Sequence, residues 1–226
     1  MPKPKIELCT TTLWEYPSQH YDKSMEDHSA FAGATPAWVI WNLLERYTKK
    51  NDLVVDPMAG SGTTITVARS LNRRGLGYDL EPVNNLAFRC DARKLPLENK
   101  KADFVFVDPP YSTHLEYSKN PACIGKLHAD SREYFDAMRL VLNEIKRILR
   151  PAGYMALYVS DSYENRKPFM PIGFRLFSFM ENLFSPVDII CVKRRNSKLE
   201  RPHWQEAARE GNFFLRGFNY LFIMQA

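Results

Sequence analysis

The sequence LVVDPMAGSGTT, residues 53–64, joins three apolar residues to an aspartate and a glycine-rich turn. Short apolar runs that stop at turn residues are typical of buried parallel strands. Gly60 and Gly62 allow the backbone to turn tightly and to approach a ligand without an obstructing Cβ. Since residues 63–71 have a helical pattern, we expect a strand, a tight turn and a helix whose first N–H groups face a ligand.

A second strand of the same kind is predicted at FVFV, residues 104–107, followed by DPPY at 108–111. Ligands of open α/β sheets bind beyond the carboxyl ends of the strands. Asp56 and Asp108 would therefore border one cleft. A further strand at residues 75–78 ends on Asp79, about twenty residues after the glycines, which is a position suited to a ribose diol.

Two classes of site have little support in the sequence. A phosphate-binding loop would place lysine after its last glycine, and here Thr63 stands there. The four cysteines are too dispersed for a Cys-x-x-Cys site, and the histidines form no pair at helical spacing. We therefore expect neither triphosphate binding, nor a metal site, nor a disulfide framework. The cysteines are Cys9, Cys90, Cys123 and Cys191.

The two motifs DPMAGSGTT and DPPY together resemble those of the S-adenosylmethionine-dependent amino methyltransferases, which make N6-methyladenine or N4-methylcytosine in nucleic acids. The resemblance extends over most of the chain. Residues 33–44 resemble the family's helix beside the donor pocket, where we expect Thr35 as N-cap and Pro36 as the first helical residue. Residues 91–96 resemble the third-strand segment, whose Asp91 and Ala92 would lie near the donor's adenine.

The resemblance implies a fold, a cofactor and a set of donor-binding residues. The fold is a Rossmann-like class I methyltransferase, α/β, with a predominantly parallel seven-stranded sheet, an antiparallel C-terminal strand and helices on both faces. Helices near 131–149 and 172–184 and strands near 154–159, 187–192 and 218–224 complete this order. The cofactor is S-adenosylmethionine. Its expected ligands are Thr35, Pro36, Asp56, Pro57, Met58, Ala59, Gly60, Gly62, Thr63, Thr64, Asp79, Asp91 and Ala92.

The DPPY segment supplies a chemical role for each of its residues. An exocyclic amine of adenine or cytosine is a poor nucleophile because its lone pair is delocalised into the ring. The Asp108 carboxylate and the Pro109 carbonyl would accept its N–H groups and free that pair. Pro109 and Pro110 stiffen the loop, and Tyr111 offers a ring on which an extruded base can stack. These four residues are the expected catalytic group.

Length and composition favour a single domain over residues 1–226, with 45% hydrophobic residues to build its core. No segment has the length of a membrane span, and no apolar signal region follows the N-terminus, so we expect a soluble, cytoplasmic protein. Residues 1–30 are expected to form an irregular arm. Residues 112–129 and 193–216 are the candidate substrate loops.

The charge distribution favours a nucleic-acid partner. The chain has 31 basic and 26 acidic residues, and from residue 187 onward seven bases stand against four acids. That segment mixes cationic side chains, for phosphates, with aromatic ones, for bases, as a nucleic-acid surface requires. The alternative is an ordinary solvated loop whose aromatic residues pack on the sheet. The expected phosphate contacts are Lys193, Arg194, Arg195 and Lys198.

Three functions remain open at this stage. The motif order favours a small DNA methyltransferase whose recognition elements are short or come from a separate partner or a second copy in a homodimer. Because no large recognition region is evident, methylation of structured RNA is the alternative. A catalytically silent binding protein is the third, although the intact DPPY segment argues against it. The choice between adenine N6 and cytosine N4 also stays open.

Overall fold

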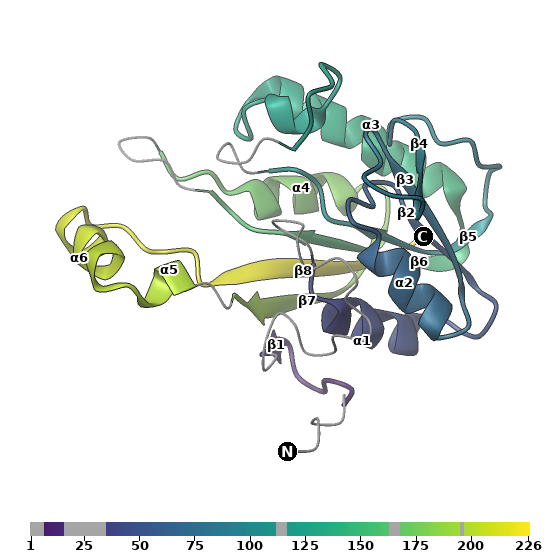
Figure 1. Cartoon of the computed structure of the whole chain (residues 1–226), viewed down its shortest axis with the longest axis horizontal. Coiled ribbons are helices and arrows are strands. Elements are labelled where there is room, and N and C mark those ends of the chain that lie inside the picture. Colours follow the sequence, from purple (N-terminus) through teal and green to yellow (C-terminus); the bar gives the residue numbers. More distant parts are fainter. Residues whose placement is uncertain (1–6, 16–34, 112–116, 163–167, 195–196) are drawn as a thin grey trace.

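The computed structural model describes residues 7–15, 35–111, 117–162, 168–194 and 197–226, which form eight strands, six α-helices and one short 3-10 helix (Figure 1). The strands are β1 (Leu13–Trp14), β2 (Leu53–Asp56), β3 (Arg74–Asp79), β4 (Ala87–Arg89), β5 (Ala102–Val107), β6 (Leu149–Val159), β7 (Ser185–Lys193) and β8 (Phe218–Gln225). The helices are α1 (Ala37–Tyr47), α2 (Thr63–Ser70), η1 (Ile124–Lys126), α3 (Arg132–Ile148), α4 (Ile172–Met180), α5 (Ser197–Glu200) and α6 (Pro202–Glu210).

All eight strands belong to one sheet in the order β1-β7-β8-β6-β5-β2-β3-β4. The neighbours from β4 to β6 are parallel, whereas β8 runs antiparallel to both β6 and β7. The expected parallel sheet with an antiparallel C-terminal strand is confirmed. Since β7 is antiparallel to β8, it points the same way as β5 and β6, and its carboxyl end lies at the same edge of the sheet.

The eighth strand, β1, was not expected. Leu13–Trp14 pairs in parallel with Cys191 and Val192 of β7, and Trp14 is 1% exposed and packs edge-on against Trp38. This part of the chain is therefore ordered against the sheet and is not the irregular arm expected for residues 1–30. Two residues are too few to show the alternation by which a strand is recognised in sequence. Residues 1–6 and 16–30 lie outside the described part.

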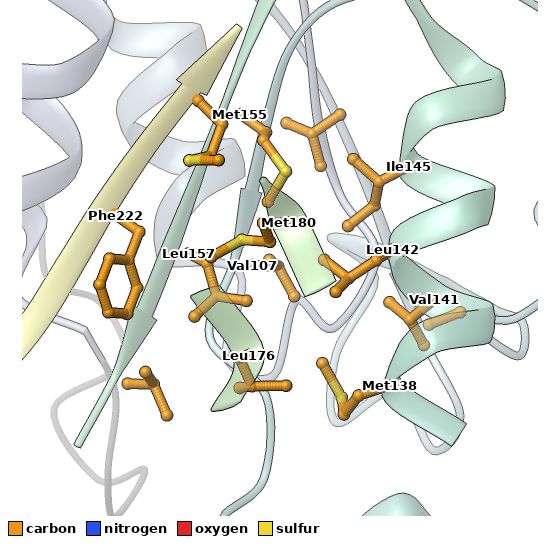
Figure 2. Packing of buried hydrophobic residues seen from close by; sticks show 14 of the residues in the cluster. Val107, Met138, Val141, Leu142, Ile145, Met155, Leu157, Leu176, Met180 and Phe222 are labelled. Atoms are coloured by element: carbon orange, nitrogen blue, oxygen red, sulfur yellow. The ribbon is translucent and has the colours of Figure 1, made fainter. Parts of the chain in front are cut away.

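Helices cover both faces of the sheet, with α3 and α4 on one face and α1 and α2 on the other (Figure 1). Alternate residues of β5 supply the two cores: Val105 and Val107 pack in the first, Phe104 and Phe106 in the second. Figure 2 shows the first core, where Met138, Val141, Leu142 and Ile145 of α3 face Val107, Leu157 and Leu176. The two-sided arrangement is that of the expected class I fold.

Several predicted boundaries differ from those observed. The N-cap of α3 is Ser131, whose hydroxyl accepts the Tyr134 N–H at 3.1 Å. The helix ends at Ile148, one residue before the expected end near 149, since Leu149 already pairs with Ala102 of β5. α4 ends at Met180, four residues before the expected end at 184.

Residues 193–216 hold α5 and α6, where a long connection was expected. Figure 1 shows both helices beyond the tips of β7 and β8, away from α1 to α4. All residues of α6 are described and none of them is buried. A helix without a buried face lacks the apolar periodicity on which prediction from sequence depends. Within the described residues, no helix is long and apolar enough to cross a membrane.

Candidate functional site

The two sequence motifs follow neighbouring strands. β2 and β5 pair in parallel with Val54 opposite Phe104 and Val55 opposite Val105. Asp56 and Asp108 therefore leave the sheet at the same edge, and the charge of Asp56 raises the pKa of Asp108. The glycine turn and the DPPY segment thus border one site, as the sequence predicts.

The glycine turn is bonded to the end of the next strand. Gly60 and Gly62 have φ values of 49° and 86°, in the region that favours glycine. The Ala59 N–H donates to the Tyr78 carbonyl at 2.8 Å, and the Gly60 N–H donates to Asp79 Oδ2 at 2.9 Å. Gly62 precedes α2, whose first turn receives no side-chain cap among the described residues. Its N–H groups are therefore available to a ligand.

Asp56 stabilises this turn from within. Its carboxylate accepts the Met58 N–H at 3.0 Å and the Thr64 hydroxyl at 2.6 Å. Burial raises the pKa of Asp56 to about 7, against the opposing effect of these hydrogen bonds. Since Asp56 and Thr64 are both buried and bonded to each other, their observed role is to join the turn to α2.

The other two expected donor-binding acids lie after β3 and β4. The Asp79 carboxylate accepts the N–H groups of Gly60 and Glu81. Asp91 is bonded through both oxygens to the Arg93 guanidinium, at 2.9 and 2.5 Å, and this hydrogen bonding lowers the pKa of Asp91. Arg93 was not among the expected site residues, although an arginine two positions after an aspartate is within reach of it.

Asp108 is half-buried just after the end of β5 and hydrogen-bonded to Thr35. The Thr35 hydroxyl donates to Asp108 Oδ2 at 2.6 Å. Burial raises the pKa of Asp108 to about 7, while the Thr35 bond and the more distant Arg194 guanidinium lower it. The expectation that Thr35 caps α1 is wrong. Pro36 occupies the cap position and no side chain caps that helix among the described residues, because the Thr35 hydroxyl is used across the site instead.

Two tyrosines lie near Asp108. Tyr111 is half-buried against the core, and a backbone hydrogen bond from Ser160, just past β6, fixes its hydroxyl. Tyr134 is fully buried, and its hydroxyl has no hydrogen-bond partner among the described residues. Burial raises the pKa of the Tyr134 hydroxyl, and Tyr111 and Asp108 are close enough to raise it further. The helical spacing of Tyr134 predicted only a core residue, and nothing in the sequence indicated that its buried hydroxyl would have no partner among the described residues.

Residues 117–127 pack beside the DPPY segment. A Cβ added to Gly125 would lie 2.7 Å from the Tyr117 ring and 2.9 Å from Pro110, so the backbone passes close to both. Glu81 Oε2 accepts the Ser118 hydroxyl at 2.5 Å and the Lys119 N–H at 3.0 Å. The described part of the candidate 112–129 loop is thus bonded to the end of β3. Residues 112–116 lie outside the described part.

The four expected phosphate contacts do not form one group. Lys193 is paired with Glu15 at 2.6 Å. Arg194 lies directly after β7 and acts electrostatically on Asp108 and Tyr111. Arg195 and the side chain of Lys198 lie outside the described part. Of the four expected phosphate contacts, Arg194 is therefore the one described side chain with an electrostatic effect on the DPPY segment. In the described part of the chain, no three His, Cys, Asp or Glu side chains are placed to hold a metal ion.

Comparison with known sequences identifies amino DNA methyltransferases. Residues 4–84 match the family model N6_N4_Mtase, described as DNA methylase. The type II methyltransferase M.HindIII of Haemophilus influenzae is 34% identical over 73 residues, which are 32% of this chain and 23% of that protein. M1.MboII of Moraxella bovis is 32% identical over 92 residues, or 38% and 35% of the two chains. These matches cover well under two thirds of either relative.

Comparison with solved structures concerns the fold alone. TrmN from Thermus thermophilus has a TM-score of 0.55 and 17% identity, over 87% of this chain and 50% of that one. A didemethyltoxoflavin N1-methyltransferase from Burkholderia thailandensis has a TM-score of 0.52 and 16% identity, over 84% and 77%. The shared fold is that of class I methyltransferases. Over residues 4–84, which carry the first of its two motifs, this chain is similar to the DNA methylase family.

Proposed function

We propose that this protein transfers a methyl group from S-adenosylmethionine to the exocyclic amine of adenine or cytosine in DNA. The observation that carries the proposal is the half-buried Asp108, bonded to Thr35 at 2.6 Å, at the same sheet edge as the glycine turn. Relatives named type II methyltransferases support this choice of reaction. Because this chain matches only part of each relative, the target sequence must be found by experiment.

The residues present fit the donor. The uncapped start of α2 offers backbone N–H groups, and the two left-handed glycines keep the turn free of Cβ atoms at their positions. Each Asp79 oxygen accepts one backbone N–H and keeps a further lone pair for a ribose hydroxyl. Asp91 and the buried Ala92 would border the adenine. When bound, S-adenosylmethionine supplies a methyl group activated by its positive sulfur.

Asp108 would act on the nucleophile. Within the described residues its Oδ2 accepts the Thr35 hydroxyl and its Oδ1 accepts no hydrogen bond. Oδ1, with the Pro109 carbonyl, would receive the N–H groups of the target amine and localise the nitrogen lone pair. The ionised carboxylate is a stronger acceptor than the neutral carboxyl, so ionisation of Asp108 favours this step. The protein thus supplies mainly position and electrostatics.

The recognition elements would lie at the same edge. Residues 117–127 pack on Pro110, and the segment that holds α5 and α6 leaves the sheet beside Arg194. These elements are small, so a second copy of this chain or a separate specificity partner would complete the DNA-binding surface. We place the reaction in the cytoplasm, where chromosomal DNA of the relatives' bacterial hosts is found.

Transfer to purified nucleic acid tests the proposal. The protein is incubated with methyl-labelled S-adenosylmethionine and matched pools of unmethylated genomic DNA and total RNA, and the nucleosides are identified by mass. The expected result is label in N6-methyldeoxyadenosine or N4-methyldeoxycytidine, the modified nucleosides of DNA. Label confined to RNA would replace the substrate in the proposal. Donor binding without transfer to either pool would leave a binding protein.

Arg194 gives a further prediction, on the salt dependence of DNA binding. If Arg194 contacts a phosphate, Arg194→Gln should flatten the slope of log Kd against log salt by about 0.9 for duplex DNA. Lys101→Gln is the matched control, because Lys101 precedes β5 at the opposite edge of the sheet and is exposed. Filter binding or fluorescence anisotropy between 50 and 300 mM salt, roughly the range in which such slopes are measured, gives both values. Equal slopes for Arg194→Gln and wild type would contradict the assigned contact.

A further inference from the structure

Thr35 and Asp108 are joined across 73 residues of chain by one short hydrogen bond. Thr35 is 8% exposed and directly precedes Pro36, the cap residue of α1. That helix is firmly held, since Val39, Ile40, Leu43 and Leu44 are fully buried in the second core. The Thr35 hydroxyl is thus presented to Asp108 by a rigid element.

The donor inventory of threonine restricts what Thr35 can do. A hydroxyl has one O–H to donate. In this structure the Thr35 hydroxyl donates to Asp108 Oδ2, so it can only accept a hydrogen bond from any other group. A role as hydrogen-bond donor to the cofactor would require that the bond to Asp108 be given up.

The surroundings of Asp108 give this bond an electrostatic effect. Burial and the neighbouring Asp56 favour the neutral carboxyl, whereas Thr35 and Arg194 favour the carboxylate. The hydroxyls of Tyr111 and Tyr134 also lie within electrostatic reach. Among the described residues, Thr35 makes the one direct hydrogen bond to the carboxylate. Hydrogen bonds to charged groups are stronger than neutral ones, so its loss should be measurable.

We propose that Thr35 is a positioning residue for Asp108, whose hydroxyl holds Oδ2, keeps the carboxylate ionised and leaves Oδ1 for the amine of the target base. This inference rests on the proposed function for its catalytic consequence. The Thr35–Asp108 coupling itself is a property of the free protein. The two can therefore be tested separately.

The test compares Thr35→Val, which removes the hydroxyl at nearly constant volume, with Thr35→Ser, which keeps it. In the free protein the ionisation of Asp108 is followed by carboxyl carbon NMR, with Asp108→Asn to assign the signal. With active protein, kcat is measured as a function of pH and donor affinity by calorimetry. Thr35→Val should raise the pKa of Asp108 and lower kcat at pH 7 about tenfold, with recovery at higher pH. Thr35→Ser should resemble wild type, and the donor Kd should change less than about twofold in both variants.

Two outcomes would overturn the inference. An Asp108 titration identical in Thr35→Val and Thr35→Ser would show that the hydroxyl does not act on the carboxylate. A weakened donor Kd with an unchanged pH profile would make Thr35 a donor ligand. If Thr35→Val does not fold, Thr35→Ala removes the same hydroxyl with a smaller side chain. Should wild type methylate neither DNA nor RNA, the NMR comparison still decides the Thr35–Asp108 coupling.

Discussion

Asp108→Asn is expected to lower methyl transfer by about 10²–10⁴-fold while stabilising the folded protein at pH 8. Asparagine keeps an oxygen that can accept the Thr35 hydroxyl, but its neutral amide polarises the target amine far less. Donor affinity should be retained, because the substitution lies in the DPPY segment and not in the glycine turn. The loss should therefore fall on kcat.

The stability gain follows from the raised pKa of Asp108. Its ordinary value is 3.8, and in the folded protein it is about 7. The folded state thus holds the proton more tightly than the unfolded chain. The contribution of this carboxyl is fully present below about pH 4 and is lost as the pH rises through about 7, an effect of up to about 4 kcal/mol. Asparagine cannot ionise and avoids this loss.

Urea unfolding at pH 5 and pH 8 measures this effect. The gain from Asp108→Asn should be larger at pH 8 than at pH 5. Asp188→Asn is the matched control, since Asp188 is exposed on β7, and it should change stability by less than about 0.5 kcal/mol at either pH. An equal gain at both pH values, or full activity of Asp108→Asn, would contradict the role of an ionised carboxylate at this position.

Gly62→Ala should have the second large effect, on both donor binding and stability. Gly62 has φ +86°, and a Cβ there would lie 2.6 Å from Leu86 Cδ1 and 2.8 Å from Leu86 Cβ. Left-handed backbone costs an L-residue roughly 1–2 kcal/mol, and the contact with Leu86 adds to this. We expect a total loss of about 2–3 kcal/mol of unfolding free energy. Because the glycine turn would shift, donor affinity should fall at least about tenfold.

Gly217→Ala is the matched control for this substitution. A Cβ at Gly217 meets no atom within 4 Å, so the added methyl group has open space. Its unfolding free energy should stay within about 0.5 kcal/mol of wild type, and its donor affinity should not change. Calorimetry with S-adenosylmethionine and urea unfolding give both quantities. Wild-type donor affinity in Gly62→Ala would show that the turn does not bind the donor.

The shared sheet edge of the two motifs could be predicted because local sequence patterns specify it. Apolar runs that end on Asp56, Asp79 and Asp108 specify parallel strands, and parallel strands bring those residues to one edge. The parallel direction of β2, β3 and β5 could therefore be predicted from segments of about ten residues or fewer, which is the usual length of a strand.

The features that were missed depend on tertiary partners. Thr35 has the chemistry of a helix cap, and only the folded chain shows that Asp108 is its partner. Arg93 binds Asp91, and the Tyr134 hydroxyl is buried without a partner among the described residues. Neither the choice of partner nor its absence is encoded in residue spacing.

The segment with α5 and α6 illustrates how such a fold can diversify. It begins and ends on the antiparallel pair β7 and β8, whose register is fixed by the sheet itself. Since α6, described in full, buries none of its residues, it contributes to neither core. Swapping this module for one of another length or sequence would leave the strand tips untouched. If this segment contacts the substrate, as proposed, its replacement would alter target choice and leave Asp56, Asp79 and Asp108 in place.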